Sequence, residues 1–279
     1  MPKLYFVIFI VVVLSVYAAM HGFVYWRVAS GLALTSGQRL ALKLLLAAGA
    51  LTFIAGEFLS RLTPAYHLLY LGSLWLGVIS VALAVFLPEL ILSLIFSRQR
   101  RLFVLASLAL VLAISAFSLL NVAFGPVLRQ VRIPVRGLDP GLEGFSIVQL
   151  SDLHLGNLTR AKQLRRIVER VNALKPDLIC ITGDTLDGDI CRDEGYCRIL
   201  KDLQARHGVA AVTGNHEFYA GIGKFLELAR RSQWRVLRNQ SWVIDGRLAL
   251  IGLEEDSAER FKLPGPDLRA ALRSVPAGI

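Results

Sequence analysis

Histidine and cysteine are both scarce in this 279-residue sequence. It contains five histidines, none of them after His216, and three cysteines. The cysteines form no Cys-x-x-Cys pair, which excludes the usual structural zinc motifs. Cys180 falls in an apolar, strand-like run and is predicted to be a buried thiol. Cys191 and Cys197 leave two alternatives open, a disulfide in an oxidising compartment or two free thiols.

Acidic residues are nearly absent from the first 125 positions, which hold only Glu57 and Glu89 against eight lysines and arginines. More than half of the sequence is hydrophobic (54%), and its mean hydropathy of +0.54 is high for a soluble protein. The net charge of +10 therefore comes mostly from basic residues that flank apolar segments. Since no basic stripe with interleaved aromatic residues occurs, no nucleic-acid partner is expected.

Four long apolar runs, at 4–26, 40–59, 66–96 and 102–128, are each long enough to cross a bilayer. They predict a four-helix transmembrane region over residues 1–128, with the lipid bilayer as its partner. The first run exceeds the core of a signal peptide, so we interpret it as a retained anchor. The ionisable residues in or near these runs are interpreted as interfacial anchors close to span ends, without a transport role; they are His21, Lys43, Glu57, His67 and Glu89.

Lysine and arginine in the short connections set the expected orientation, because they are enriched on the cytoplasmic side. The connections after the first and third spans hold six such residues and the opposite side holds five. The six are Arg27, Arg39, Lys43, Arg98, Arg100 and Arg101, and the five are Lys3, Arg61, Arg129, Arg132 and Arg136. This balance favours an extracytoplasmic location for the residues after 128, in a bacterial inner or plasma membrane.

The pattern changes after the fourth span. Residues 129–144 are predicted to form a linker, with strand character at 130–135 and turns at its glycines and proline. Residues 145–279 then alternate between strand-like and helix-like segments, which predicts an α/β domain. Helices are expected at 159–174, 194–206, 221–231 and 267–273, with Thr159 as an N-cap, and strands at 145–150, 177–182, 209–213, 234–237, 242–245 and 248–251. Asp245-Gly246 predicts a hairpin between the last two strands.

Side chains that bind metals follow three of these strands. The first strand runs into Asp152 and His154, and the second into Gly183-Asp184 and Asp187. The third runs into Gly214-Asn215-His216-Glu217. Each motif alone is weak, because Gly-Asp and Gly-Asn are also ordinary turn sequences. Together, at the carboxyl ends of successive strands of an α/β sheet, they predict a shared metal site.

These three motifs resemble those of the calcineurin-like metallophosphoesterases, which read Asp-x-His, Gly-Asp-x-x-Asp and Gly-Asn-His-Asp/Glu. The segment 144–156 is similar to the membrane-associated bacterial branch of that family. The resemblance covers residues 129–279 and implies a four-layer αββα sandwich with two divalent metal ions between the sheet ends. A phosphorylated substrate follows from it, and the membrane region suggests a lipid-linked or envelope phosphate.

The resemblance also implies roles for individual residues. Asp152 and His154 would bind the first metal, Asp184 would bridge both metals, and Asn215 would bind the second. His216 would not ligate, but would protonate the leaving oxygen or stabilise the transition state, with Asp187 or Glu217 as its orienting partner. Mixed oxygen and nitrogen ligands favour Mn, Fe or Zn over Ca.

One departure from the family pattern is important. The family continues with a lone histidine and a Gly-His-x-His motif, and this sequence has no histidine after His216. We therefore expect a C-terminally incomplete domain, an under-liganded second metal, and weak or absent activity of this chain. Two alternatives stay open: a non-catalytic membrane protein whose degenerate domain binds a phosphorylated ligand, and a small transporter with a regulatory domain. The transporter is disfavoured, because no span has a broken or charged midpoint.

Overall fold

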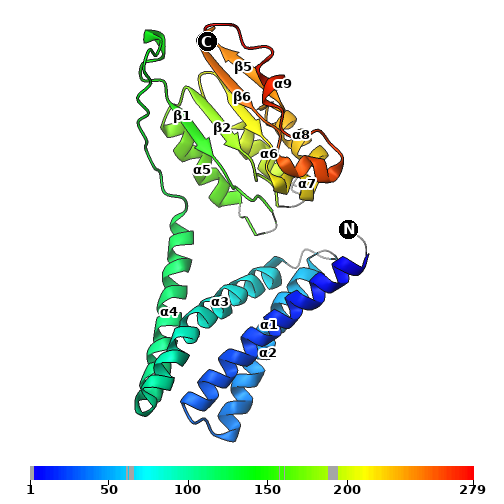
Figure 1. Cartoon of the computed structure of the whole chain (residues 1–279). Helices are drawn as coiled ribbons and strands as arrows, with labels where there is room; N and C mark the ends of the chain where they lie inside the picture. The colour runs from blue at the N-terminus through cyan, green and yellow to red at the C-terminus, as the bar shows by residue number, and fades with distance from the viewer. Residues whose placement is uncertain (1–2, 61, 63–65, 157, 160, 188–193) are drawn as a thin grey trace. The chain divides into compact units, whose positions relative to one another are not determined.

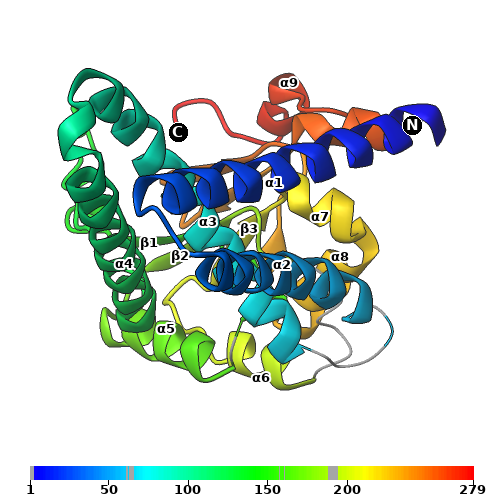
Figure 2. The ribbon, with the colours of Figure 1, turned by 90° about the horizontal axis from the view of Figure 1, so that it is seen from below.

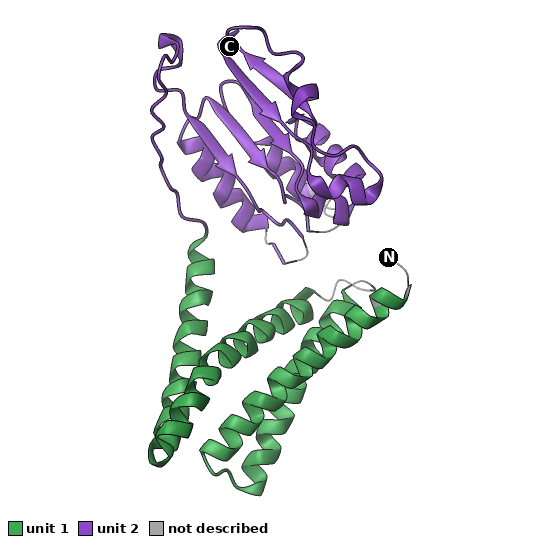
Figure 3. Ribbon diagram, viewed as in Figure 1, with its two compact units in different colours: residues 1–125 green, residues 126–279 purple. Residues whose placement is uncertain are grey.

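The computed structural model describes residues 3–60, 62, 66–156, 158–159, 161–187 and 194–279. By its internal contacts the chain divides into two units, residues 1–125 and residues 126–279, which Figure 3 shows in green and purple. The first unit is built from helices and the second is an α/β domain. Each unit is described by itself below.

The first unit contains four long helices, α1 (Lys3–Gly31), α2 (Ser36–Leu59), α3 (Tyr66–Ile95) and α4 (Arg100–Phe124) (Figure 1). A short 3₁₀ turn, Ser97–Gln99, precedes α4. All four helices are long and apolar enough to cross a membrane, which confirms the prediction of four spans. Thr35 and Gln38 exchange side chain-to-backbone hydrogen bonds at the start of α2, so the helix begins where the sequence provides a capping box.

Small residues let the backbones of α2 and α3 approach closely. A Cβ atom at Gly56 would lie 2.7 Å from the Cα atom of Leu69, and one at Gly72 would overlap the backbone of Phe53. Such approaches are how membrane helices gain packing without a hydrophobic driving force. Around them a buried core forms from Tyr17, Val24, Val28, Leu46, Ile79, Ala82, Phe86, Val104 and Val111.

Arg27 and Glu89 form a buried ion pair between α1 and α3. Arg27 donates from Nε and Nη2 to both carboxylate oxygens of Glu89, at 2.8–3.0 Å, and the two residues are 1% and 3% exposed. The hydroxyl of Ser93 also donates to Glu89. The interpretation of Glu89 as an interfacial anchor was therefore wrong, as was the counting of Arg27 with the connection after the first span. Without Arg27, each side of the predicted membrane region has five lysines and arginines near the span ends, so this count no longer favours either orientation.

His21 is also buried within the helical unit, where an interfacial position was expected. Its Nδ1 atom lies 2.8 Å from the carbonyl oxygen of Tyr17, and its Nε2 atom lies 2.9 Å from the indole nitrogen of Trp75. An indole N–H can only donate, so Nε2 accepts and Nδ1 carries the proton. His21 is thus a neutral residue whose two nitrogens are both satisfied.

The second unit is organised around a parallel sheet in the order β1-β2-β3-β4. Its strands are β1 (Ile147–Leu150), β2 (Leu178–Thr182), β3 (Val209–Val212) and β4 (Arg235–Val236). The connections carry α5 (Ala161–Ala173), α6 (Glu194–Lys201), α7 (Asn215–Ala220) and α8 (Ile222–Arg231). Apolar faces of α5, α6 and α8 bury one side of the sheet, with Leu164, Val168, Ile199, Leu200, Phe225 and Leu228 packed on Ile179, Ile181 and Ala211. The predicted α/β class with a parallel sheet is confirmed.

An antiparallel hairpin, β5 (Gln240–Ile244) and β6 (Leu248–Gly252), lies beside the sheet and approaches it closely at β3 and at Leu237, next to β4. Asp245 and Gly246 both have positive φ, at 50° and 68°, so the predicted hairpin turn is present, and three residues, 245–247, connect the two strands. Gly252 brings β6 so close to β3 that a Cβ atom there would lie 3.0 Å from Val212 Cγ1. Two further short elements follow, the 3₁₀ segment Asp256–Phe261 and α9 (Leu268–Leu272).

Several local predictions differ from the structure. Residues 130–135 form no strand, because no other described segment pairs with them. The helix α7 was not predicted, since a six-residue helix is too short to show periodicity. Cys180 is half-buried, and its burial raises the pKa of its thiol. Cys191 lies outside the described residues, so the pairing of Cys191 with Cys197 stays open.

Candidate metal site

The loop after β1 presents Asp152 and His154. Both have left-handed backbone conformations, with φ of 54° and 43°. The loop is held by its neighbour, because Asp152 N donates to Gly183 O at 3.2 Å and His154 N donates to Asp184 O at 3.0 Å. The Thr159 hydroxyl, predicted as a helix cap, donates to the carbonyl of His154 at 2.9 Å and braces the same loop.

The loop after β2 presents Asp184 and lies against the loop after β3. Gly183 has φ of 94°, and a Cβ atom on it would lie 2.8 Å from Gly214 N. A Cβ atom on Gly214 would in turn overlap the Asp184 carboxylate. The absence of side chains at these two glycines is therefore what lets Asp184 sit beside the start of α7.

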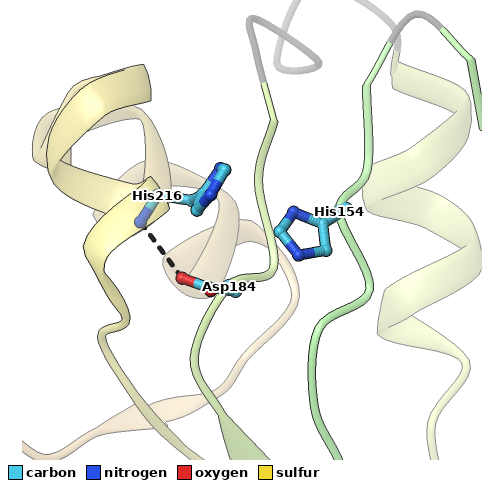
Figure 4. Close-up of side chains that lie close together, drawn as sticks. All are labelled: His154, Asp184 and His216. Atoms are coloured by element: carbon cyan, nitrogen blue, oxygen red, sulfur yellow. Dashed lines mark hydrogen bonds between the residues drawn. The ribbon is translucent and has the colours of Figure 1, made fainter. Parts of the chain in front are cut away.

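Three side chains from three strand ends converge at this edge of the sheet. Ligand atoms of His154, Asp184 and His216 all lie within 4.8 Å of one another (Figure 4). The backbone N–H of His216 donates to Asp184 Oδ1 at 3.0 Å, which is the dashed line in Figure 4. The imidazole rings of His154 and His216 meet edge to face, with centroids 4.6 Å apart. The expected convergence of the three motifs is present in the geometry.

Glu217 holds the loops together from beneath the site. It is fully buried, and its two oxygens accept hydrogen bonds from four backbone N–H groups, those of Asp184, Thr185, Leu186 and Gly214, at 2.6–3.1 Å. These bonds join the loop after β2 to the first turn of α7. No hydrogen bond between Glu217 and the ring of His216 occurs among the described residues, so the geometry favours Asp187, the other suggested orienting partner.

Asp187 is the residue that contacts the histidines. Its Oδ1 atom lies 2.6 Å from His216 Nδ1 and 3.3 Å from His154 Nδ1. The first contact has hydrogen-bond geometry, whereas the buried His154 Nδ1 has no hydrogen-bond partner among the described residues. The interaction with Asp187 orients the His216 ring and leaves its Nε2 atom available toward the site.

Asn215 and Asp152 lie at the margin of the cluster. The amide of Asn215 faces the Asp184 carboxylate, and with its NH₂ group turned inward it donates to both Asp184 oxygens, at 3.2 and 3.3 Å. In the opposite orientation of the amide, the Asn215 side-chain oxygen would point toward the Asp184 carboxylate. The two groups could then bind one cation between them. Asp152 is 65% exposed at its side chain, and its Oδ1 atom lies 3.8 Å from His154 Nε2.

The donor set fits a divalent transition metal. It combines imidazole nitrogens with carboxylate and amide oxygens, the mixture that Mn, Fe and Zn accept and Ca disfavours. Three carboxylates, Asp152, Asp184 and Asp187, surround two histidines, so the site favours a cation. The unpartnered Nδ1 atom of His154 is a local feature that a bound cation would explain.

The sequence motifs had included Asp187 and Glu217 without separating their roles. The spacing of Glu217, three residues after Gly214 at the start of a helix, is the signal of a residue that caps backbone N–H groups. No local signal would have shown that Thr159 braces His154, because that contact depends on how the loop after β1 folds back. The fold and site together describe an α/β domain that follows four apolar helices and has a candidate metal site at one edge of its sheet.

Comparison with known proteins agrees with this class. The family model of the calcineurin-like phosphoesterases matches residues 145–261. A transmembrane protein with a metallophosphoesterase domain from Danio rerio is 30% identical over 171 residues, which cover 57% of this chain and 38% of that protein. An uncharacterized metallophosphoesterase from Aquifex aeolicus is 31% identical over 148 residues, which cover 53% of this chain and 56% of that protein. No solved structure matches the chain.

Residues 145–261 are therefore a calcineurin-like phosphoesterase domain, and the chain is similar to metallophosphoesterases over that part. Its relatives include animal proteins as well as bacterial ones, so the similarity extends beyond a bacterial branch. The matched segments cover between about a third and somewhat more than half of the length of these curated relatives.

Proposed function

We propose that this protein is a membrane-anchored, metal-dependent phosphoesterase that hydrolyses phosphate mono- or diesters. The observation that carries the proposal is the convergence of His154, Asp184 and His216 within 4.8 Å, at the strand ends of a calcineurin-like phosphoesterase domain. The four apolar helices supply the anchor.

The proposed ligands are Asp152, His154 and Asp184 for a first divalent ion, and Asp184 and Asn215 for a second. Two such ions would activate a water molecule and neutralise charge on the phosphoryl oxygens. Mn, Fe and Zn are the ions that this donor set favours. Support for the second ion comes from the Asn215 amide, which lies against Asp184 rather than pointing to solvent.

His216 is proposed as the group that acts on the substrate. Asp187 holds its Nδ1 atom, so the ring is fixed and Nε2 is the nitrogen that can donate a proton to the leaving oxygen. The backbone N–H of His216 donates to Asp184, which ties the position of this ring to a proposed metal ligand. Glu217 keeps that arrangement by binding the backbone of both loops.

A phosphate group carried by a lipid is the proposed substrate class, and a bacterial plasma membrane with the domain on its extracytoplasmic side is the proposed location. The support is that the catalytic unit is joined directly to helices long enough to cross a bilayer, which keeps it near membrane-borne substrates. Bacterial proteins are among the relatives.

The test is hydrolysis of aryl phosphate mono- and diesters by the purified chain, with added Mn²⁺, together with metal analysis. The expected rate is low but measurable, because only Asp184 and Asn215 would bind the second ion. Asp184→Asn is expected to lose bound metal and activity, whereas Asp202→Asn, an exposed aspartate remote from these loops, should change neither. His216→Ala should keep the metal and lose activity.

Other outcomes would point elsewhere. Loss of metal in His216→Ala would make His216 a ligand rather than a proton donor. Metal and phosphate binding without turnover would contradict the proposed activity and favour the non-catalytic alternative. Equal metal content in wild type, Asp184→Asn and Asn215→Ala would remove the proposed site altogether.

A further inference from the structure

An apolar groove runs along the first two helices of the membrane unit. It has a volume of about 480 Å³ and lies between α1 and α2, which run alongside each other (Figure 1, Figure 2). Small residues form its floor, and Gly22 faces open space, since a Cβ atom there would meet nothing within 4 Å. The wall residues include Leu14, Ala18, Ala47, Ala50 and Ile54. A groove of this shape suits a flexible hydrocarbon chain.

One end of the groove carries a single cation. Lys43 lines it and is its only charged residue, and its Nζ atom lies 5.3 Å from the centre of the Tyr25 ring. No carboxylate among the described residues pairs with Lys43. Lys43 is the eighth residue of α2, so it lies roughly 10 Å from the start of that helix. Its side chain is long enough to reach the level of lipid headgroups from there.

Two other polar residues line the groove: Tyr17, whose buried hydroxyl has no hydrogen-bond partner among the described residues, and His21, whose ring nitrogens are both bonded. His21 bonds to the Tyr17 carbonyl through Nδ1 and accepts from Trp75 through Nε2, so it is neutral and offers no charge to a ligand. The groove therefore presents one positive charge at one end, and its remaining lining is uncharged and mostly apolar. That distribution is complementary to a lipid with an anionic headgroup and is not complementary to a water-soluble ion.

We propose that the groove between α1 and α2 binds one anionic phospholipid, with its phosphate at Lys43 and Tyr25 and one acyl chain over Gly22. An ammonium beside an aromatic ring binds a phosphate as a point charge while the ring shields it from water. The acyl chain covers the small residues that the neighbouring helices leave open. This site belongs to the membrane unit and does not depend on the proposed hydrolytic activity.

The test uses the full chain in detergent, delipidated and titrated with phosphatidylglycerol or phosphatidylcholine, with bound lipid counted by native mass spectrometry. One phosphatidylglycerol should bind about five-fold more tightly than phosphatidylcholine, as expected for one basic residue acting on an anionic headgroup. Gly22→Leu should abolish this single tight site, because the new side chain occupies the groove from a position where a Cβ atom meets nothing within 4 Å.

Two matched controls separate the site from lipid that coats the helices nonspecifically. Gly77→Leu adds the same side chain at another helical glycine that faces open space, on α3, and should leave binding unchanged. Lys43→Gln should remove the preference for phosphatidylglycerol, whereas Arg98→Gln, an exposed basic residue before α4, should keep it. Equal binding by the Gly22 and Gly77 variants, or an intact preference in Lys43→Gln, would overturn the proposal.

Discussion

The carboxylate of Glu217 accepts a hydrogen bond from the backbone N–H of Asp184 at 2.9 Å, within a buried cluster of four such bonds. This contact ties the start of α7 to the loop that carries the proposed bridging ligand. An amide in place of the carboxylate would turn an NH₂ group toward backbone donors and leave some of them unpaired.

Glu217→Gln should therefore destabilise the α/β unit by about 2–4 kcal/mol, because buried donors lose their acceptor. Bound metal should fall with it, since Asp184 is no longer held in place. Thermal unfolding followed by tryptophan fluorescence, with metal analysis, measures both effects. Glu227→Gln changes an exposed glutamate that pairs with Arg230 and Arg231 and serves as the matched control. Indistinguishable stability of the two variants would contradict the proposed role of Glu217.

Asp187→Asn should reduce hydrolysis by roughly 10- to 100-fold at unchanged metal content, the usual effect of losing a residue that orients a histidine at a metal site. The reason is the 2.6 Å contact between Asp187 and His216 Nδ1. A double variant with His216→Ala should be no worse than His216→Ala alone, because the two residues act as one unit. If Asp187→Asn instead loses as much metal as Asp184→Asn, then Asp187 is a ligand.

Breaking the ion pair between Arg27 and Glu89 should destabilise the helical unit by about 3–5 kcal/mol, because a single uncompensated charge is left buried. Glu89→Met and Arg27→Met should each show this loss in unfolding of the reconstituted protein by a denaturing detergent. The double variant should be more stable than either single one, since no unpaired charge is left behind. Additive losses in the double variant would show that packing, not charge, dominates.

Asp177 gives a prediction about pH. Its carboxylate accepts from the backbone and hydroxyl of Ser146, and these bonds, with Arg206 and His207 nearby, lower its pKa below the ordinary 3.8. A depressed pKa stabilises the fold above the pKa of the unfolded chain, and this contribution is lost as the pH falls through the folded-state value. Asp177→Asn should thus lower the unfolding temperature at pH 7, and its difference from wild type should shrink below pH 3.8. A difference that is constant at all pH values would contradict this.

The orientation of the protein can be read with reporters fused after residue 140. Arg98 lies in the short connection between α3 and α4, and Arg100 and Arg101 are the first two residues of α4. Basic residues so close to the end of a span act strongly on topology. We expect that connection in the cytoplasm and the α/β unit outside, so alkaline phosphatase fused there should be active and a green fluorescent protein fusion dark. The reverse pattern would place the domain in the cytoplasm.

Much of the architecture was predictable because it depends on local sequence. Apolar runs predicted four helices, and the Asp245-Gly246 turn predicted the hairpin, since each feature is set by neighbouring residues. The positions of Asp152, Asp184 and His216 at strand ends were predictable for the same reason. Parallel strands bring their ends to one edge whatever the details of the loops.

The contacts that hold the site were harder to predict because they join distant segments. Glu217 bonds to backbone groups more than thirty residues away, and backbone donors leave no trace in the side-chain pattern. Arg27 and Glu89 are 62 residues apart in the sequence. Considered separately, each charged residue was interpreted as lying near the end of a membrane span. Hydropathy measures how apolar a segment is, but it does not show which of its few charged residues form ion pairs with one another.

Gly183 and Gly214 have no side chains to take part in chemistry, yet they determine how far apart the loops after β2 and β3 stand. The distance between Asp184 and Asn215 is thus encoded by two residues that touch neither metal nor substrate. A list of the proposed metal ligands alone would therefore leave out the two residues that set the spacing between them. Sequences that keep all the ligands but carry a larger residue at either glycine should not be counted as having the same site.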